Sequence, residues 1–263
     1  MAGVDGLLID LDGTVYERDA LVPGAARAVE ELGERGVPFL FTTNTSRMAR
    51  RTVVDRLAGM GLPLDPERIL TAPLAAARWL RREGLGRVHL LLPESTHEDF
   101  SDFEIAGPDE DPEAVVVGDL GAGFTFERLN GAFRALRSGA RLVAVHRNRY
   151  WLPPEGPTLD AGPFVVGLEY AAGVEAVLVG KPAPAFFELA AGMLDRPVGG
   201  LAVVGDDPES DIRGARAAGL TAIQVETGKF DAERATGAPS AERPHHRIPS
   251  LAELPLLLED AAG

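Results

Sequence analysis

The sequence Gly-Leu-Leu-Ile-Asp-Leu-Asp-Gly-Thr at residues 6–14 decides the predicted fold. Small or apolar residues occupy 6–9, which is typical of a buried parallel strand. Asp10 and Asp12 then stand at the carboxyl end of that strand, where ligands bind in open α/β sheets. Gly13 allows a sharp turn after them. Taken alone, the pattern also fits a helix N-cap aspartate followed by a solvated turn aspartate, so the rest of the chain must decide.

Other predicted strands deliver polar residues at their carboxyl ends in the same way. These strands are predicted at 37–41, 174–179 and 201–205. The polar residues that follow them are Thr43 and Asn44, then Lys181, then Asp206, Asp207 and Asp211. Helices are predicted at 23–32, 48–59, 72–83, 184–194, 211–218 and 251–258. This alternation predicts an α/β fold with a doubly wound, Rossmann-like parallel sheet.

The middle of the chain reads as a second, smaller α/β unit. It holds predicted strands at 87–92, 114–118 and 142–145, and predicted helices at 126–136 and 163–172. Loops are predicted at 94–112, 153–157 and 232–247. We therefore expect a core domain formed by 1–76 and 176–263, with an α/β cap domain of residues 77–175 inserted into it.

Composition excludes several classes of function. The 263 residues include no cysteine, so a disulfide, a thiolate metal site and a thiol nucleophile are all absent. A formal net charge of −14 argues against nucleic acid or an anionic membrane as a general partner. No apolar run approaches the roughly 18 residues of a membrane span, and no leader segment is recognisable, so we expect a cytoplasmic protein.

The clustered carboxylates predict a metal site for phosphoryl chemistry. Several ionised carboxylates in a small space repel one another unless a cation lies between them. Oxygen ligands without His or Cys favour Mg²⁺. A lysine and a hydroxyl beside such a metal suit a phosphoryl group. Of the two front aspartates, Asp10 is ionised at neutral pH and suits a nucleophile, while Asp12 suits proton transfer if its pKa is raised.

The combination resembles the haloacid dehalogenase superfamily of phosphohydrolases. Its four motifs are matched by residues 10–14, by Thr43-Asn44, by Lys181, and by residues 205–207 with Asp211. About 137 residues separate Asn44 from Lys181, which leaves room for a cap between the second and third motifs. That placement resembles subfamily IIA, which includes 4-nitrophenylphosphatase-like and phosphoglycolate phosphatase-like enzymes.

Within subfamily IIA, the chain is similar to the branch of phospholysine phosphohistidine inorganic pyrophosphate phosphatase and related hydrolase-domain-containing proteins. The residues that suggest this are 146–151, 162–164, 168–171 and 227–230. In that branch the second acidic position is often Ser, whereas here it is Asp12. The substrate preference of the branch is therefore not carried over to this chain.

The resemblance implies a role for each motif residue. Asp10 is implied as the nucleophile that forms an aspartyl-phosphate, and Asp12 as the general acid and base. Mg²⁺ is implied to be held by Asp10, the main-chain carbonyl of Asp12, and Asp206. Thr43, Asn44 and Lys181 are implied to bind the phosphoryl group, while Asp207 or Asp211 lies among the metal ligands or just outside them. A homodimer through the cap is compatible with the family.

We expect a phosphatase that acts on a small phosphorylated metabolite: a phosphomonoester, a phosphoramidate or pyrophosphate. Two alternatives share the same core chemistry, namely a signalling module that accepts a phosphoryl group on an aspartate, and a phosphomutase. Arg147, Asn148 and Arg149 follow a cap strand and suit either substrate contact or a solvated face. Lys229 and the pair His245-His246 are interpreted as solvated surface residues, and 121–123 as a turn of the cap.

Overall fold

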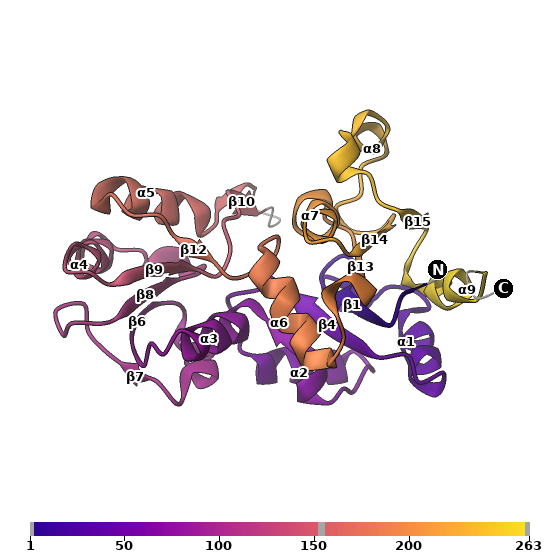
Figure 1. The fold of residues 1–263 in the computed structure, drawn as a ribbon, viewed down its shortest axis with the longest axis horizontal. Helices are drawn as coiled ribbons and strands as arrows, with labels where there is room; N and C mark the ends of the chain where they lie inside the picture. The colour runs from indigo at the N-terminus through magenta and orange to yellow at the C-terminus, as the bar shows by residue number, and fades with distance from the viewer. Residues whose placement is uncertain (1–2, 152–155, 261–263) are drawn as a thin grey trace. The chain divides into compact units, whose positions relative to one another are not determined.

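The computed structural model describes residues 3–151 and 156–260, and the chain forms two compact units. The first unit comprises Met1–Thr43, Val54–Leu70 and Lys181–Gly263, and the second comprises Asn44–Val53 and Thr71–Gly180. Both are built from parallel strands and helices, which confirms the predicted α/β class. Figure 1 traces them along the chain.

A six-stranded sheet in the order β15-β14-β13-β1-β4-β5 forms the centre of the first unit. Its strands are β1 (Gly6–Asp10), β4 (Phe39–Thr43), β5 (Ile69–Thr71), β13 (Leu201–Gly205), β14 (Thr221–Val225) and β15 (His246–Ile248). β1 pairs in parallel with β4 on one side and with β13 on the other. Every residue of these three strands is buried, so helices must cover both faces.

The helices of this unit are α1 (Ala25–Glu34), α2 (Arg50–Gly59, which spans the boundary between the units), α6 (Pro184–Leu194), α7 (Gly214–Ala217), α8 (Ala232–Gly237) and α9 (Leu254–Asp260). Four of these helices lie where the sequence predicts them. The helix predicted at 211–218 is instead a π-helical turn at Pro208–Arg213 followed by a four-residue helix, and the helix at Ala232–Gly237 lies in a predicted loop. α1 packs against α9, α6 against β4, and α7 against β14. From β1 the chain moves outward through β4 and β5, and later returns to β13 on the other side. The carboxyl ends of β4, β1 and β13 therefore meet at a topological switch point, where α/β sheets bind ligands.

The second unit contains its own five-stranded sheet in the order β12-β9-β8-β6-β7. Its strands are β6 (Arg87–Leu91), β7 (Glu104–Ile105), β8 (Ala114–Val117), β9 (Arg141–Ala144) and β12 (Val177–Leu178), and its helices are α3 (Ala72–Arg82), α4 (Phe126–Arg137) and α5 (Gly162–Ala172). All four pairings in this sheet are parallel.

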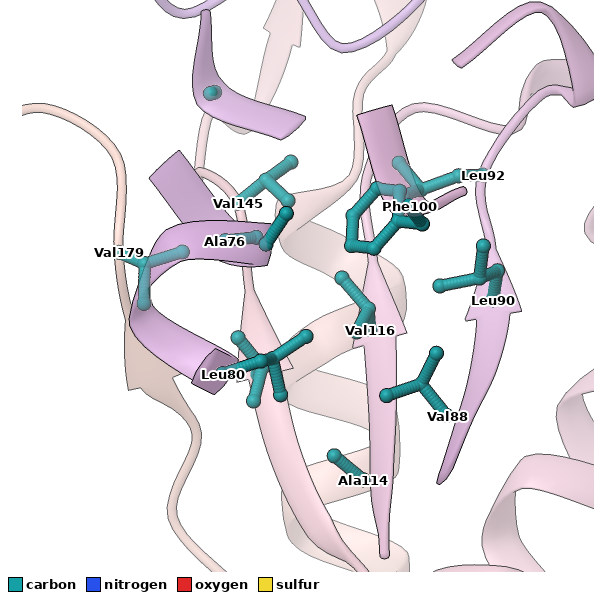
Figure 2. Close-up of a cluster of buried hydrophobic side chains, with 13 residues drawn as sticks. Ala76, Leu80, Val88, Leu90, Leu92, Phe100, Ala114, Val116, Val145 and Val179 are labelled. Carbon is teal, nitrogen blue, oxygen red and sulfur yellow. The ribbon is translucent and has the colours of Figure 1, made fainter. Parts of the chain in front are cut away.

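Alternate residues of these strands build a core on each face of the sheet. Val88, Val116 and Val143 pack with Leu80 of α3, and Figure 2 shows this cluster, which also contains Phe100. Their sequence neighbours point the other way, into a second cluster that includes Leu136 of α4, Leu168 of α5 and the strand residues Leu91, Val115, Val117 and Leu142. The period of two in a strand thus explains why nearly continuous apolar runs were found here in the sequence.

The structure corrects several element predictions. The loop predicted at 94–112 contains a 3-10 helix at Glu94–Phe100 and strand β7, and the loop predicted at 232–247 contains α8 and the start of β15. The strand predicted at 174–179 is only the two-residue β12, and it pairs with β9 of the second unit rather than joining the core sheet. The reason is tertiary pairing, because Val177 lies opposite Val143. The division at 77–175 remains a prediction for the cap.

Two short antiparallel pairs were not predicted. One joins β2 (Tyr16–Glu17) to β3 (Ala20–Leu21), and the other joins β10 (Tyr150–Trp151) to β11 (Thr158–Leu159). Most of the loop predicted at 153–157 lies outside the described residues. Among the helices in the described ranges, none combines the length and the hydropathy needed to span a bilayer.

A half-buried acid of the second unit, Asp99, lies at the starts of two helices. Asp99 accepts a hydrogen bond from the backbone N–H of Arg50, at 3.3 Å, and another from the hydroxyl of Thr71, which caps α3. Burial raises the pKa of Asp99 to about 6 against the lowering effect of these donors. The folded state therefore binds this proton more tightly than the unfolded chain, so stability falls as pH rises from about 4 to 6.

We expect Asp99→Asn to be more stable than the parent protein above pH 6 by about 1–2 kcal/mol, allowing for partial exposure, and equal to it near pH 4. Asn keeps an acceptor for Arg50 but carries no charge to bury. Urea unfolding from pH 4 to pH 8 measures this difference. Asp102→Asn is the control, because Asp102 is exposed, pairs with Arg81 and has a lowered pKa. A stability difference for Asp99→Asn that does not change with pH would contradict the expectation.

Candidate active site

The side chain of Asp10 ends β1 inside a buried ionic cluster. Its Oδ1 atom lies 2.5 Å from Nζ of Lys181, and the same nitrogen lies 2.6 Å from Oδ1 of Asp211. The hydroxyl of Thr14 lies 3.4 Å from Oδ2 of Asp10. The Lys181 side chain is only 1% exposed. The structure thus places Asp10 and Lys181, which the sequence analysis assigns to one site, in direct contact.

Asp206 and Asp211 complete the cluster from the segment after β13. Among the described residues, Asp10, Asp206 and Asp211 each offer a carboxylate oxygen, and these oxygens lie within 4.8 Å of one another. Asp211 reaches the cluster because Gly205 leaves space for it: a Cβ at that glycine would lie 2.4 Å from the Asp211 carboxyl carbon. The glycine of the fourth motif is therefore required sterically.

The charges in this cluster are unbalanced. Burial, followed by the charges of Asp10 and Asp211, raises the pKa of Asp206 to about 8. Burial also raises the pKa of Asp211 to about 7, with Lys181 acting in the opposite direction. The pKa of Asp10 is raised as well, again by burial first. For Lys181, burial would lower the pKa, but the two bonded carboxylates outweigh it and raise the pKa.

These donors fit a hard divalent cation. The cluster has three buried carboxylates, and the Lys181 ammonium contacts two of them, those of Asp10 and Asp211. When the carboxylates are ionised, the cluster therefore carries excess negative charge. A cation that accepts oxygen ligands would relieve the repulsion that raises the pKa values. The arrangement could therefore hold a metal ion, in agreement with the prediction made from the residue types.

Asp12 lies in the turn after β1 and keeps exposed surface. Loss of water around the carboxyl raises its pKa, while Lys229 and Arg56 act to lower it. A raised pKa suits an acid that must hold a proton near neutral pH. Gly13 follows with φ of 87°, a conformation that favours glycine.

Asp207 has a different role from Asp211. Its Oδ1 accepts hydrogen bonds from the backbone N–H groups of Glu209 (2.8 Å) and Ser210 (3.1 Å), and its Oδ2 lies 2.7 Å from Nζ of Lys229. Burial alone would raise the pKa of Asp207, but Lys229 and these N–H groups lower it to about 2. Asp207 therefore caps a helical turn, while Asp211 faces the cluster.

The side chain of Lys229 is 65% exposed, as the sequence interpretation of a solvated surface residue expects, but its backbone contacts the acidic cluster, which that interpretation does not include. The backbone N–H of Lys229 donates to Oδ2 of Asp206 at 2.7 Å, and its ammonium contacts Asp207. A signal was present in the composition, because Lys181 and Lys229 are the two lysines of a chain that otherwise uses arginine. The rarity of lysine in this chain marks Lys229 as clearly as it marks Lys181.

The second motif spans the boundary between the units. Thr43 is buried at the end of β4 in the first unit, next to the strand that carries Asp10. Asn44 is the first residue of the second unit. The assignment of both residues to phosphoryl binding remains a prediction.

Other candidate residues lie outside the cluster. Arg147 forms an ion pair with Glu169 at 2.8 Å, and Asn148 and Arg149 are exposed, all in the second unit. Their contact with substrate stays a prediction. Nδ1 of His245 accepts the backbone N–H of Ala222, which agrees with a structural role for this residue. Residues Gly121–Gly123 form a 3-10 turn.

Comparisons with known sequences agree with this arrangement. A family model described as haloacid dehalogenase-like hydrolase matches residues 7–106, and one described as HAD-hydrolase-like matches residues 178–254. Haloacid dehalogenase-like hydrolase domain-containing protein 2 of Rattus norvegicus is 38% identical over 86% of this chain and 85% of its own length. Phospholysine phosphohistidine inorganic pyrophosphate phosphatase of Rattus norvegicus is 34% identical over 88% of this chain and 86% of its own length.

Solved structures share the same fold. The 4-nitrophenylphosphatase of Thermotoga maritima superposes with a TM-score of 0.89 at 29% identity, covering 96% of this chain and 97% of that one. The p-nitrophenyl phosphatase of Archaeoglobus fulgidus gives a TM-score of 0.90 at 28% identity, covering 97% of this chain and 99% of that one. NagD of E. coli K-12 gives a TM-score of 0.86 at 25% identity, covering 95% of this chain and 98% of that one.

Proposed function

The chain belongs to the haloacid dehalogenase-like hydrolase family, and on this premise we propose that it is a Mg²⁺-dependent phosphatase of small phosphorylated metabolites. The reaction proceeds through an aspartyl-phosphate on Asp10. The observation that carries this proposal is the buried cluster in which Lys181 contacts Asp10 at 2.5 Å beside Asp206 and Asp211. A carboxylate fixed by an ammonium and surrounded by further carboxylates suits attack on phosphorus with a cation present.

Asp10 and Asp12 divide the covalent and proton-transfer chemistry. A carboxylate oxygen of Asp10 forms a bond to phosphorus while the bond from phosphorus to the leaving oxygen breaks. Asp12 donates its proton to that oxygen, so the product leaves as an alcohol. Asp12 then removes a proton from water, whose oxygen attacks the same phosphorus. Inorganic phosphate is released and the Asp10 carboxylate is restored.

The remaining residues bind and orient. Thr43, Asn44 and Lys181 contact the oxygens of the phosphoryl group, for which a hydroxyl, an amide and an ammonium supply donors. Asp10, Asp206 and the main-chain carbonyl of Asp12 hold Mg²⁺, with Asp211 beside them. When bound, Mg²⁺ neutralises the negative charge of the phosphoryl oxygens and of the clustered carboxylates.

The names of the relatives support a choice of substrate class. One group of relatives is named for phospholysine, phosphohistidine and pyrophosphate, and two structural neighbours are named for 4-nitrophenyl phosphate. We propose a phosphomonoester as the main substrate, with phosphoramidates and pyrophosphate as candidates. The cytoplasmic location, the absence of nucleic-acid and membrane partners, and the homodimer through the cap remain predictions.

We expect the purified protein to release phosphate from 4-nitrophenyl phosphate with Mg²⁺ present, and chelation by EDTA to lower the rate by at least about 100-fold. Adding Mg²⁺ in excess should restore the rate, whereas adding Ca²⁺ should not, because Mg²⁺ demands tighter octahedral geometry. A panel of sugar phosphates, nucleotides, phosphorylated amino acids and pyrophosphate then ranks substrates. Full activity after chelation would exclude the metal-dependent mechanism.

The same preparation separates the alternatives. A phosphatase hydrolyses the aspartyl-phosphate within its turnover time, whereas a signalling module would retain it. A phosphomutase would transfer the group to a second hydroxyl of the substrate and release little inorganic phosphate. Acid-quenched phosphoenzyme, released phosphate and substrate phosphorylated at the second hydroxyl, measured together, distinguish these three outcomes.

A further inference from the structure

The segment Thr227–Lys229, after β14, is attached to both acidic motifs of the first unit. The hydroxyl of Thr227 donates to the carbonyl oxygen of Gly13 at 2.6 Å. The backbone N–H of Gly228 donates to Oε1 of Glu17 at 2.8 Å, and that of Lys229 donates to Oδ2 of Asp206 at 2.7 Å. One short segment therefore joins the turn after β1 to the carboxylate after β13.

Two glycines allow the backbone to lie directly against the Asp206 carboxylate. A Cβ on Gly228 would lie 2.1 Å from Oδ2 of Asp206, and a Cβ on Gly13 would lie 2.2 Å from the same atom. Both glycines have positive φ values, of 62° and 87°. The Cα of Gly13 also lies 2.6 Å from the position of a Cβ on Gly228. Asp206 is therefore enclosed by two backbone segments that tolerate no side chain.

This enclosure fixes the orientation of the carboxylate. With Oδ2 held by a backbone N–H and packed against two glycines, the carboxyl group has little freedom to rotate. The carboxylate as a whole then has a defined direction within the cluster formed with Asp10 and Asp211. Groups that orient metal ligands in this way commonly change metal affinity by about 10- to 100-fold when they are altered.

We propose that Thr227–Lys229 is a positioning segment that orients Asp206 for cation binding. The inference rests on the proposed metal-dependent function and adds to it a role for residues outside the four motifs. Lys229 contributes mainly through its backbone N–H, while its ammonium pairs with Asp207 and keeps that carboxylate in its capping position. These residues act through Asp206 and are not catalytic residues.

Gly228→Ala tests the proposal through Mn²⁺ binding without turnover. The concentration of free Mn²⁺ in a titration is followed by electron paramagnetic resonance, and we expect the variant to bind Mn²⁺ at least about 10-fold more weakly than the parent protein. The matched control is Gly36→Ala. Gly36 has nearly the same φ, 66°, but no atom lies within 4 Å of the position that a Cβ would take there. The control should suffer similar backbone strain and keep the parent affinity.

Thr227→Val provides a second test, in which no atom is added to the side chain. It removes the hydroxyl bonded to Gly13 but keeps the shape of the side chain, and we expect a loss of Mn²⁺ affinity of about 3- to 10-fold, restored by Thr227→Ser. Circular dichroism in EDTA verifies that each variant is folded. If folded Gly228→Ala and Thr227→Val both bind Mn²⁺ as the parent does, the positioning role is wrong.

Failure of the proposed function would look different. In that case the parent protein itself would bind no Mn²⁺ and release no phosphate, before any variant is compared. A parent protein that binds Mn²⁺ and hydrolyses phosphate esters, alongside unaffected variants, would overturn the positioning role alone. Weak binding in Gly228→Ala with normal binding in Gly36→Ala supports the proposal.

Discussion

Asp10→Asn is expected to abolish phosphate release from 4-nitrophenyl phosphate, with a fall of at least about 10⁴-fold in kcat. The amide nitrogen and oxygen of Asn are poor nucleophiles, so the covalent intermediate cannot form at a useful rate. The fold should survive, because the change removes one negative charge from a buried group of three carboxylates.

Asp19→Asn is a suitable control for that substitution. Asp19 lies close in sequence, its side chain is 94% exposed, and it pairs with Arg56 at the surface. Its loss should leave turnover within about two-fold of the parent, as is usual for an exposed ion pair. Undiminished turnover by Asp10→Asn would exclude Asp10 as the nucleophile, while the metal requirement could still be tested separately.

Lys181→Met is expected to destabilise the protein by about 3–5 kcal/mol at pH 8 in EDTA, and to remove activity. The substitution leaves the buried carboxylates of Asp10 and Asp211 without the ammonium that lies within 2.6 Å of each. The loss should shrink as pH falls from 8 to 6, because burial raises the pKa of Asp211 to about 7 even with Lys181 present; without the lysine this pKa is higher still, so protonation removes the unpaired charge. Urea unfolding at pH 8 and pH 6 measures both effects.

The second lysine gives the matched control. Lys229 is 65% exposed and pairs with Asp207, so Lys229→Met should cost less than about 1 kcal/mol. Mg²⁺ should partly restore the stability of Lys181→Met, because a divalent cation can replace the lost positive charge. Equal stability of Lys181→Met and the parent protein at pH 8 would show that the two carboxylates are protonated and need no partner.

The sheet and the principal aspartates could be predicted because local sequence determines them. A run of buried apolar residues ending in acids identifies β1 and β13, and the strand direction places Asp10 and Asp206 at the same edge. Lys181 was recognisable because a lone lysine before proline stands out in an arginine-rich chain. These features depend on residues that are neighbours along the chain.

Other features depend on contacts that the sequence does not encode locally. Asp207 and Asp211 could not be separated, because a π-helical turn at Pro208–Arg213, capped by Asp207, sets which carboxylate faces Lys181. The segment after β4 makes long-range contacts, such as that of Ser46 with His146 at 2.9 Å. Lys229 touches Asp206 through its backbone N–H, which every residue except proline possesses, so the rarity of lysine could mark this position but could not predict the contact.

The scarcity of lysine has a practical consequence for handling this protein. Apart from the amino terminus, amine-reactive dyes, cross-linkers and activated surfaces can attack only two side chains, and Lys181 is shielded while Lys229 is 65% exposed. Coupling through amines would therefore concentrate the label beside the acidic cluster and obstruct it. Conjugation should use an engineered cysteine instead, because the chain contains none and a single thiol would give one defined attachment point.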